Sequence, residues 1–214
     1  MNREIYIFSG LGADERAFQR LDFSGYSINF IKWVLPNVKD TIESYATRLL
    51  EQIKTKKPIL IGLSFGGIMA IEIAKQIETE KVILIASAKT KNEIPFYFRL
   101  VGMLELHRLL PIDIITKSNF FTYWFFGAKP GFEEKLLKQI LKDSDTTFMS
   151  WAIDKIAKWS NVKSIENVFH IHGSKDRILP LRFIKCNSVI INGGHFMTLN
   201  KANEISKVIR KEVG

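Results

Sequence analysis

Short apolar runs alternate with amphipathic segments along most of this chain of 214 residues, and this alternation limits the fold more than any other feature. Several runs are rich in β-branched residues and apolar at every position, as strands covered by helices on both faces are. An order of strand, helix, strand, helix favours parallel pairing through right-handed crossovers, and hence a three-layer α/β/α sandwich. We expect six strands, at residues 4–8, 27–33, 58–63, 81–86, 168–172 and 188–191.

The segments between these runs predict helices. Residues 41–54, 65–77 and 201–212 repeat apolar side chains every three or four positions, as a helix with one buried face does. Asp40 directly precedes the first segment and is expected as its N-cap. Neither an internal repeat nor a low-complexity linker interrupts the pattern.

The alternation breaks once, between about residues 89 and 160, where the composition becomes helical and aromatic. We therefore expect a helical cap insertion at 89–160 within a core domain formed by 1–88 and 161–214. The aromatic residues of this segment form either the core of the insertion itself or the lining of a pocket, and a cap requires both.

Charge and composition exclude several classes of protein. The net charge is +9, but its lysines are spread over the chain and no nucleic-acid-binding motif accompanies them, so we expect no nucleic-acid partner. Cys186 is the one cysteine, expected as a small buried hydrophobe, and it cannot form a disulfide within the chain. The apolar runs are far shorter than the ~18 residues of a membrane span, and the N-terminus does not fit a signal peptide. We expect a cytoplasmic protein without a membrane span; its oligomeric state stays open.

The segment Gly62-Leu63-Ser64-Phe65-Gly66 matches the pattern G-x-S-x-G. The match alone is weak, because roughly one chain in fifteen of this length would contain it by chance. Its position between an expected strand and an expected helix strengthens it, since such a turn lifts the serine hydroxyl above the sheet edge. The alternative is that Ser64 merely caps the helix.

A serine hydroxyl becomes a nucleophile when a base takes its proton and an acid orients that base. His195 follows the last expected strand, and Asp176 follows the fifth, so both lie at the carboxyl edge of the sheet with Ser64. The alternatives are an exposed loop residue for His195 and a turn-former for Asp176.

The other histidines are poorer candidates for the base. His107 lies in the expected insertion, and His170 and His172 point to one face within the fifth strand. Two histidines without a third ligand at a suitable spacing do not predict a metal site, so we expect neither metal nor cofactor.

These motifs resemble those of the α/β-hydrolase superfamily over roughly residues 4–88 and 165–212. The matching segments occur in the family's order: Phe8-Ser9-Gly10-Leu11-Gly12, the turn at 62–66, Gly-x-x-Asp at 173–176 and Gly-Gly-His at 193–195. The resemblance implies a six-stranded, mostly parallel sheet in the order 2-1-3-4-5-6.

The resemblance also implies a role for each site residue. Ser64 would be the nucleophile, His195 the base and Asp176 the acid of a catalytic triad, as in small serine esterases and lipases with a helical cap. The backbone N–H groups of Leu11 and Phe65 would form an oxyanion hole for the negative oxygen of the tetrahedral intermediate.

The chain departs from the family pattern in three places. Many relatives carry histidine where this chain has Ser9. His195 lies only 19 positions after Asp176, so the helix between them is expected to be trimmed to 181–185. The first two strands of the family's sheet have no counterpart here, which predicts a small version of the fold.

We expect a serine hydrolase, carboxylesterase-like, that acts on small, uncharged, short-to-medium acyl esters, because the insertion would roof the site with aromatic residues. Arg99 or Lys117 would reverse this preference if either paired with a substrate carboxylate. An acyltransferase, a cofactor-free lyase or C–C hydrolase, and a ligand-binding protein without turnover remain alternatives. The side chains expected to bind substrate are Tyr123, Trp124, Phe96 and Met197.

Overall fold

Six strands form one sheet in the computed structural model, which describes residues 3–105 and 119–214. The strand order is β2-β1-β3-β4-β5-β6 and every neighbouring pair is parallel, which confirms the expected topology. His107 and Lys117 lie outside the described residues. The strands are β1 (Glu4–Phe8), β2 (Ser27–Phe30), β3 (Ile59–Leu63), β4 (Lys81–Ile85), β5 (Val168–Gly173) and β6 (Ser188–Ile190).

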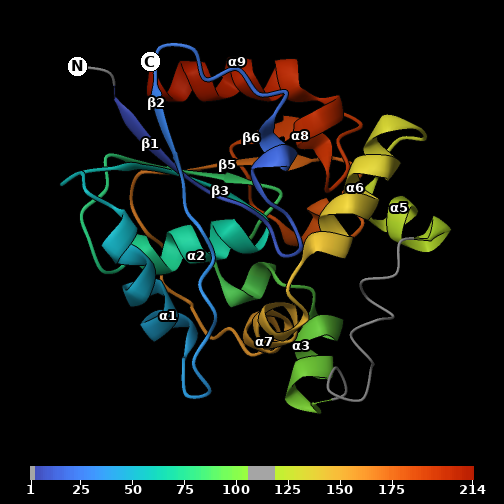
Figure 1. Ribbon diagram of the computed structural model, residues 1–214, viewed down its shortest axis with the longest axis horizontal. Helices are drawn as coiled ribbons and strands as arrows, with labels where there is room; N and C mark the ends of the chain where they lie inside the picture. The colour runs from blue at the N-terminus through green and yellow to red at the C-terminus, as the bar shows by residue number, and fades with distance from the viewer. Residues whose placement is uncertain (1–2, 106–118) are drawn as a thin grey trace.

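Helices cover both faces of this sheet, as the wholly apolar strands require. Alternate side chains of β1 enter two separate cores: Ile5 and Ile7 pack with α9 (Ala202–Val213), whereas Tyr6 and Phe8 pack with α1 (Ile42–Leu49) and α2 (Phe65–Ala74). Figure 1 shows α9 on one side of the sheet and α1 and α2 on the other.

The start of α1 corrects one expectation. Thr41, not Asp40, is the N-cap: its hydroxyl accepts the N–H of Ser44 at 3.1 Å, and the Ser44 hydroxyl accepts the N–H of Thr41 at 3.0 Å. The Asp40 carboxylate instead accepts the Asn37 N–H at 2.7 Å and pairs with Arg48 at 2.5 Å. The expectation was wrong by one residue: the Asp40 carboxylate stays near the helix end, where its Oδ1 accepts the Ser44 hydroxyl at 3.4 Å, but the backbone N–H that it accepts is that of Asn37.

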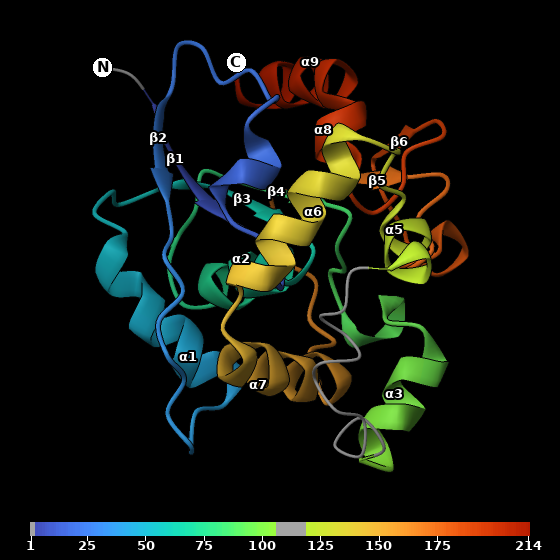
Figure 2. The same ribbon diagram turned by 45° about the vertical axis from the view of Figure 1, so that its right-hand side comes forward.

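In its described residues, the segment between β4 and β5 consists of helices joined by loops and turns. Asn119 and Asp145 cap two of its helices by accepting backbone N–H groups at 3.1 and 2.7 Å. Figures 1 and 2 show its helices on one side of the molecule. They are α3 (Phe96–Met103), α5 (Phe120–Phe126), α6 (Phe132–Asp143) and α7 (Thr146–Ala157).

Shorter elements complete the chain. In the described ranges, the 3-10 turns are η1 (Glu15–Phe18), η2 (Leu50–Gln52), η3 (Lys91–Glu93) and η5 (Leu181–Phe183). The last stands where a trimmed helix was expected at 181–185, and a short helix, α8 (Met197–Asn200), follows His195. Among the described residues, no helix has both the length and the apolarity that crossing a membrane requires.

Candidate active site

Ser64 occupies a sharp turn between the end of β3 and the start of α2, with φ 52° and ψ −120°. Few residues other than glycine adopt a positive φ, so the surrounding structure must hold this strained conformation. The Ser64 N–H donates to Ile85 O at 2.9 Å, and the Ser87 hydroxyl donates to Ser64 O at 2.6 Å.

The glycines at 62 and 66 have a direct steric reason. A Cβ on Gly62 would overlap the backbone of Gly66 and Gly67, and one on Gly66 would overlap the backbone at Phe8. Strand and helix therefore pass each other too closely for any side chain at these positions.

His195 links Ser64 to Asp176 by two hydrogen bonds. Its Nε2 lies 2.8 Å from Ser64 Oγ, and its Nδ1 lies 2.8 Å from Asp176 Oδ2. Both His195 and Asp176 are 4% exposed, so little water competes for these bonds. The three residues that the sequence analysis selected are thus brought together from three separate loops.

The Asp176 carboxylate is fixed from several sides. Its Oδ1 accepts the backbone N–H groups of Ile178 and Leu179 at 2.9 and 2.8 Å. Burial works to raise the pKa of this carboxyl, but the charge and hydrogen bond of His195, together with His172 and the Leu179 N–H, hold the pKa below its usual value. An ionised Asp176 is suited to orient His195 and to stabilise its protonated form.

His172 lies beside Asp176, and a second buried histidine, His170, contacts His172. His172 Nε2 donates to Leu179 O at 2.8 Å and lies 3.6 Å from Asp176 Oδ2, while its Nδ1 lies 3.3 Å from His170 Nε2. Burial lowers the pKa of both histidines, and that of His170 falls well below the ordinary value. Within residues 3–105 and 119–214, no group of three or more potential ligands is placed to hold a metal ion.

Leu11 and Phe65 line the same cavity as Ser64 and His195. A Cβ built on Gly10 would lie 3.4 Å from Ser64 Cβ, so the loop that carries Leu11 passes directly beside the serine. In the described part of the chain, neither the Leu11 nor the Phe65 N–H donates a hydrogen bond to another protein group. Both N–H groups are therefore available to a ligand.

The loop before Leu11 has a polar contact that the sequence analysis missed. The indole Nε1 of Trp33 donates to Ser9 Oγ at 2.9 Å, across 24 positions of sequence. Nothing in the sequence indicates which residue from the chain beyond β2 would reach Ser9.

A cavity of about 450 Å³ opens beside Ser64 and His195. Its walls are apolar apart from Thr122 and these two residues, and no Asp, Glu, Lys or Arg of the described chain lines it. The segment between β4 and β5 contributes Phe98 and Val101 from α3, Phe121, Phe125 and Phe126 from α5, and Met149, Ile153 and Ile156 from α7, among others.

The four residues expected to bind substrate are not among those that line this cavity. Phe96 is 62% exposed, and Trp124 is 46% exposed beneath the Arg177 guanidinium. Tyr123 packs against a core, and Met197 is fully buried in it. The helices turn these side chains away, because the lining residues follow helical spacing on another face, at 98 and 101 on α3 and at 121 and 125 on α5.

Arg99, which could have paired with a substrate carboxylate, does not line the cavity either. Cys186 is only half-buried, rather than buried as expected, and burial raises the pKa of its thiol.

No protein-family model and no curated protein matches the sequence. Solved structures do match the fold over nearly the whole chain. An esterase from Exiguobacterium antarcticum is 15% identical with a TM-score of 0.71, covering 99% of this chain and 91% of that chain. An enol-lactonase from Burkholderia xenovorans is 14% identical with a TM-score of 0.70, covering 100% and 92%.

A bromoperoxidase from Bacillus anthracis is also similar, at 16% identity and a TM-score of 0.69, covering 100% of this chain and 92% of that chain. At such low identities the similarity concerns the fold. The chain has the α/β-hydrolase fold, in agreement with the family that the sequence motifs resemble.

Proposed function

We propose that this protein is a serine hydrolase that cleaves an ester or related acyl bond of a small, largely apolar substrate. The observation that carries the proposal is the continuous hydrogen-bonded chain from Asp176 through His195 to Ser64, in the wall of an apolar cavity. Nucleophile, base and orienting acid stand in the order that this chemistry requires.

In the first half of the reaction, Ser64 Oγ attacks the acyl carbon while His195 Nε2 takes its proton. The carbonyl oxygen becomes negatively charged and accepts hydrogen bonds from the N–H groups of Leu11 and Phe65. When the tetrahedral intermediate collapses, the bond to the leaving alcohol breaks and His195 returns its proton to that alcohol.

In the second half, water replaces the alcohol. His195 takes a proton from the water as its oxygen attacks the acyl-enzyme carbon, and the same two N–H groups hold the new oxyanion. The bond to Ser64 Oγ then breaks, His195 reprotonates the serine, and the carboxylic acid leaves.

The cavity favours an uncharged acyl group. None of the described lining residues carries a charge that could pair with a charged acyl group, which would lose its hydration there at a cost of several kcal/mol. Each methylene that the walls take out of water contributes ~0.8 kcal/mol until the space is filled. The esterase and the enol-lactonase among the similar structures agree with ester cleavage, while the bromoperoxidase is a reminder that one fold hosts several reactions.

Labelling with a fluorophosphonate tests the proposal, because this reagent reacts with an activated serine and not with an ordinary one. We expect the wild-type protein to be labelled at Ser64 and to hydrolyse p-nitrophenyl butyrate. Ser64→Ala should lose the label and at least ~10³-fold in kcat/KM while it retains its unfolding temperature.

Ser150→Ala, which removes an exposed serine from α7, is the matched control and should behave as the wild type does. An unlabelled wild type, or a Ser64→Ala variant that is labelled and active, would refute the proposal. A wild type that reacts with neither reagent but binds apolar ligands would instead be a ligand-binding protein.

A further inference from the structure

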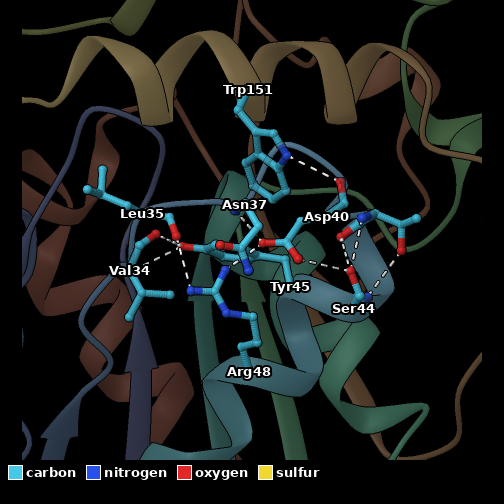
Figure 3. A network of polar contacts seen from close by, with 9 residues as sticks. Val34, Leu35, Asn37, Asp40, Ser44, Tyr45, Arg48 and Trp151 are labelled. Atoms are coloured by element: carbon cyan, nitrogen blue, oxygen red, sulfur yellow. Dashed lines mark hydrogen bonds and ion pairs between the residues drawn. The ribbon is translucent and has the colours of Figure 1, made fainter.

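Trp33 lies just beyond β2, in a segment that α1 holds firmly. The Tyr45 hydroxyl donates to Val34 O at 2.7 Å and accepts the Val34 N–H at 3.1 Å. Arg48 donates to Leu35 O at 3.1 Å and pairs with Asp40. Figure 3 shows these contacts converging on the segment, with Trp151 of α7 reaching Asp40 from the opposite side. The backbone that directly follows Trp33 therefore has little freedom.

The Trp33 side chain makes two kinds of contact. Its Nε1–H donates to Ser9 Oγ at 2.9 Å, and Ser9 is buried only two residues before Leu11. Its ring lies 5.5 Å from the Phe65 ring and is stacked on Phe148 at 5.4 Å between centroids. One indole thus contacts both chain segments whose N–H groups line the site.

We propose that Trp33 is a positioning residue that holds the N–H groups of Leu11 and Phe65 at the spacing an oxyanion requires. The inference rests on the proposed function, because an oxyanion forms only if Ser64 attacks a carbonyl. A donor stabilises the oxyanion strongly only within about 2.7–3.1 Å of it. A displacement of about 1 Å in an active site can cost ~10²-fold in rate.

A simple packing role for Trp33 would not need the hydrogen bond. A phenylalanine would keep the stacking on Phe148 and most of the contact with Phe65, but it would leave the Ser9 hydroxyl without its donor. The loop that carries Leu11 would then lose its hydrogen bond to the segment that follows β2. Trp33→Phe should therefore weaken the stabilisation of the transition state and leave the affinity for the substrate nearly unchanged.

The experiment compares Trp33→Phe and Ser9→Ala with the wild type on p-nitrophenyl butyrate. We expect kcat to fall ~10–100-fold in each variant with KM within ~3-fold, because the oxyanion exists only after attack. The affinity for a trifluoromethyl ketone, which forms a tetrahedral adduct with serine, should weaken by the same factor as kcat. The kcat of the double variant should be no lower than that of the slower single variant, because both substitutions remove the same hydrogen bond.

Trp151→Phe is the matched control. It removes an indole N–H from the same aromatic cluster, but this N–H donates to Asp40 O at 3.4 Å and not to the loop that carries Leu11. Trp151 also makes an edge contact with the Phe65 ring at 6.4 Å between centroids, and a phenylalanine keeps an aromatic ring beside Phe65. We expect its kcat to stay within ~2-fold of the wild type. Equal kcat values for Trp33→Phe and Trp151→Phe, or additive losses in the double variant, would overturn the inference.

Three further outcomes can be distinguished from these. If Trp33→Phe does not fold, Ser9→Ala decides the question alone, since it removes a single hydroxyl. If the unmodified protein shows neither labelling nor turnover, the proposed function fails and the inference falls with it. An active wild type with unaffected variants removes the role of Trp33 only.

Discussion

At the carboxyl edge of the sheet, hydrogen bonds join the side chains of Ser64, His195 and Asp176, whereas the helices across the cavity line it mainly with apolar side chains. Asp176 accepts two backbone N–H groups besides its bond to His195. On α5, by contrast, Phe121 and Phe125 line the cavity while 73% and 40% exposed.

The difference predicts two kinds of response to mutation. A hydrogen-bonded arrangement that serves proton transfer works only when all of its members are present. An apolar wall loses affinity in proportion to the contact area that is removed. Substitutions at the sheet edge should therefore abolish the reaction, whereas substitutions of cavity-lining residues in the helices should only lower its rate.

The largest expected effect tests the sheet edge. Asp176→Asn should lower kcat by about 10³–10⁴-fold, because an amide at this position favours the wrong tautomer of His195. Asp143→Asn on α6, an exposed partner of Arg16, is the matched control and should change kcat less than ~2-fold. Steady-state kinetics of the two variants on one ester measure the two values of kcat. Similar losses of kcat in both variants would contradict the special role of the sheet edge.

A second prediction compares a cavity-lining residue of α3 with an exposed residue of the same helix. Phe98→Ala should lower kcat/KM for p-nitrophenyl hexanoate about tenfold, because Phe98 lines the cavity and a lost aromatic contact is worth ~1–3 kcal/mol. Phe96→Ala, two residues away and exposed, should have almost no effect. The reverse order of effects would mean that the other face of α3 meets the substrate.

A third prediction concerns the substrate itself. Along p-nitrophenyl esters from acetate upward, kcat/KM should rise about fourfold per methylene until the cavity is filled, since ~0.8 kcal/mol corresponds to that factor. A dicarboxylic monoester should be a poorer substrate than the uncharged ester of equal length, because no charged side chain of the described wall can pair with it. A preference for the charged ester would contradict the apolar description of the wall.

The smallest expected effect concerns the stability of the fold and arises from two buried histidines of β5. Burial holds the pKa values of His170 and His172 below the ordinary value of about 6.5, so the unfolded chain takes up protons first as the pH falls. The free energy of unfolding should therefore decrease below pH ~6.5, by at most about 1.4 kcal/mol per pH unit for each histidine. Urea denaturation at pH 7, 6 and 5 measures this slope.

His170→Gln is the variant for this test, because it removes one of the two buried histidine rings, the one that contacts His172 and not Asp176. The slope below pH 6.5 should be smaller in the variant than in the wild type, and the two should agree between pH 7 and 8. An unchanged slope would mean that other groups cause the acid sensitivity.

Much of the sheet and the positions of Ser64, Asp176 and His195 could be predicted from the chain alone. The strands are short runs that are apolar on both faces, and each of the three polar residues follows a strand end within a few positions, so local pattern suffices. Element ends were less certain: β2 stops at Phe30 because the chain turns away toward α1, and Asp40 serves an ion pair instead of a helix cap.

The cavity wall and the contact of Trp33 with Ser9 depended on tertiary structure. Helical spacing groups Phe98 with Val101 and Phe121 with Phe125, but it does not tell which face of a helix meets the cavity. Packing against elements far away in sequence decides which face meets the cavity. The 2.9 Å hydrogen bond from Trp33 to Ser9 likewise joins residues that are distant in sequence. By itself the sequence determined the strand pattern and the reactive groups, because these follow from local backbone geometry; long-range packing alone decided what surrounds them.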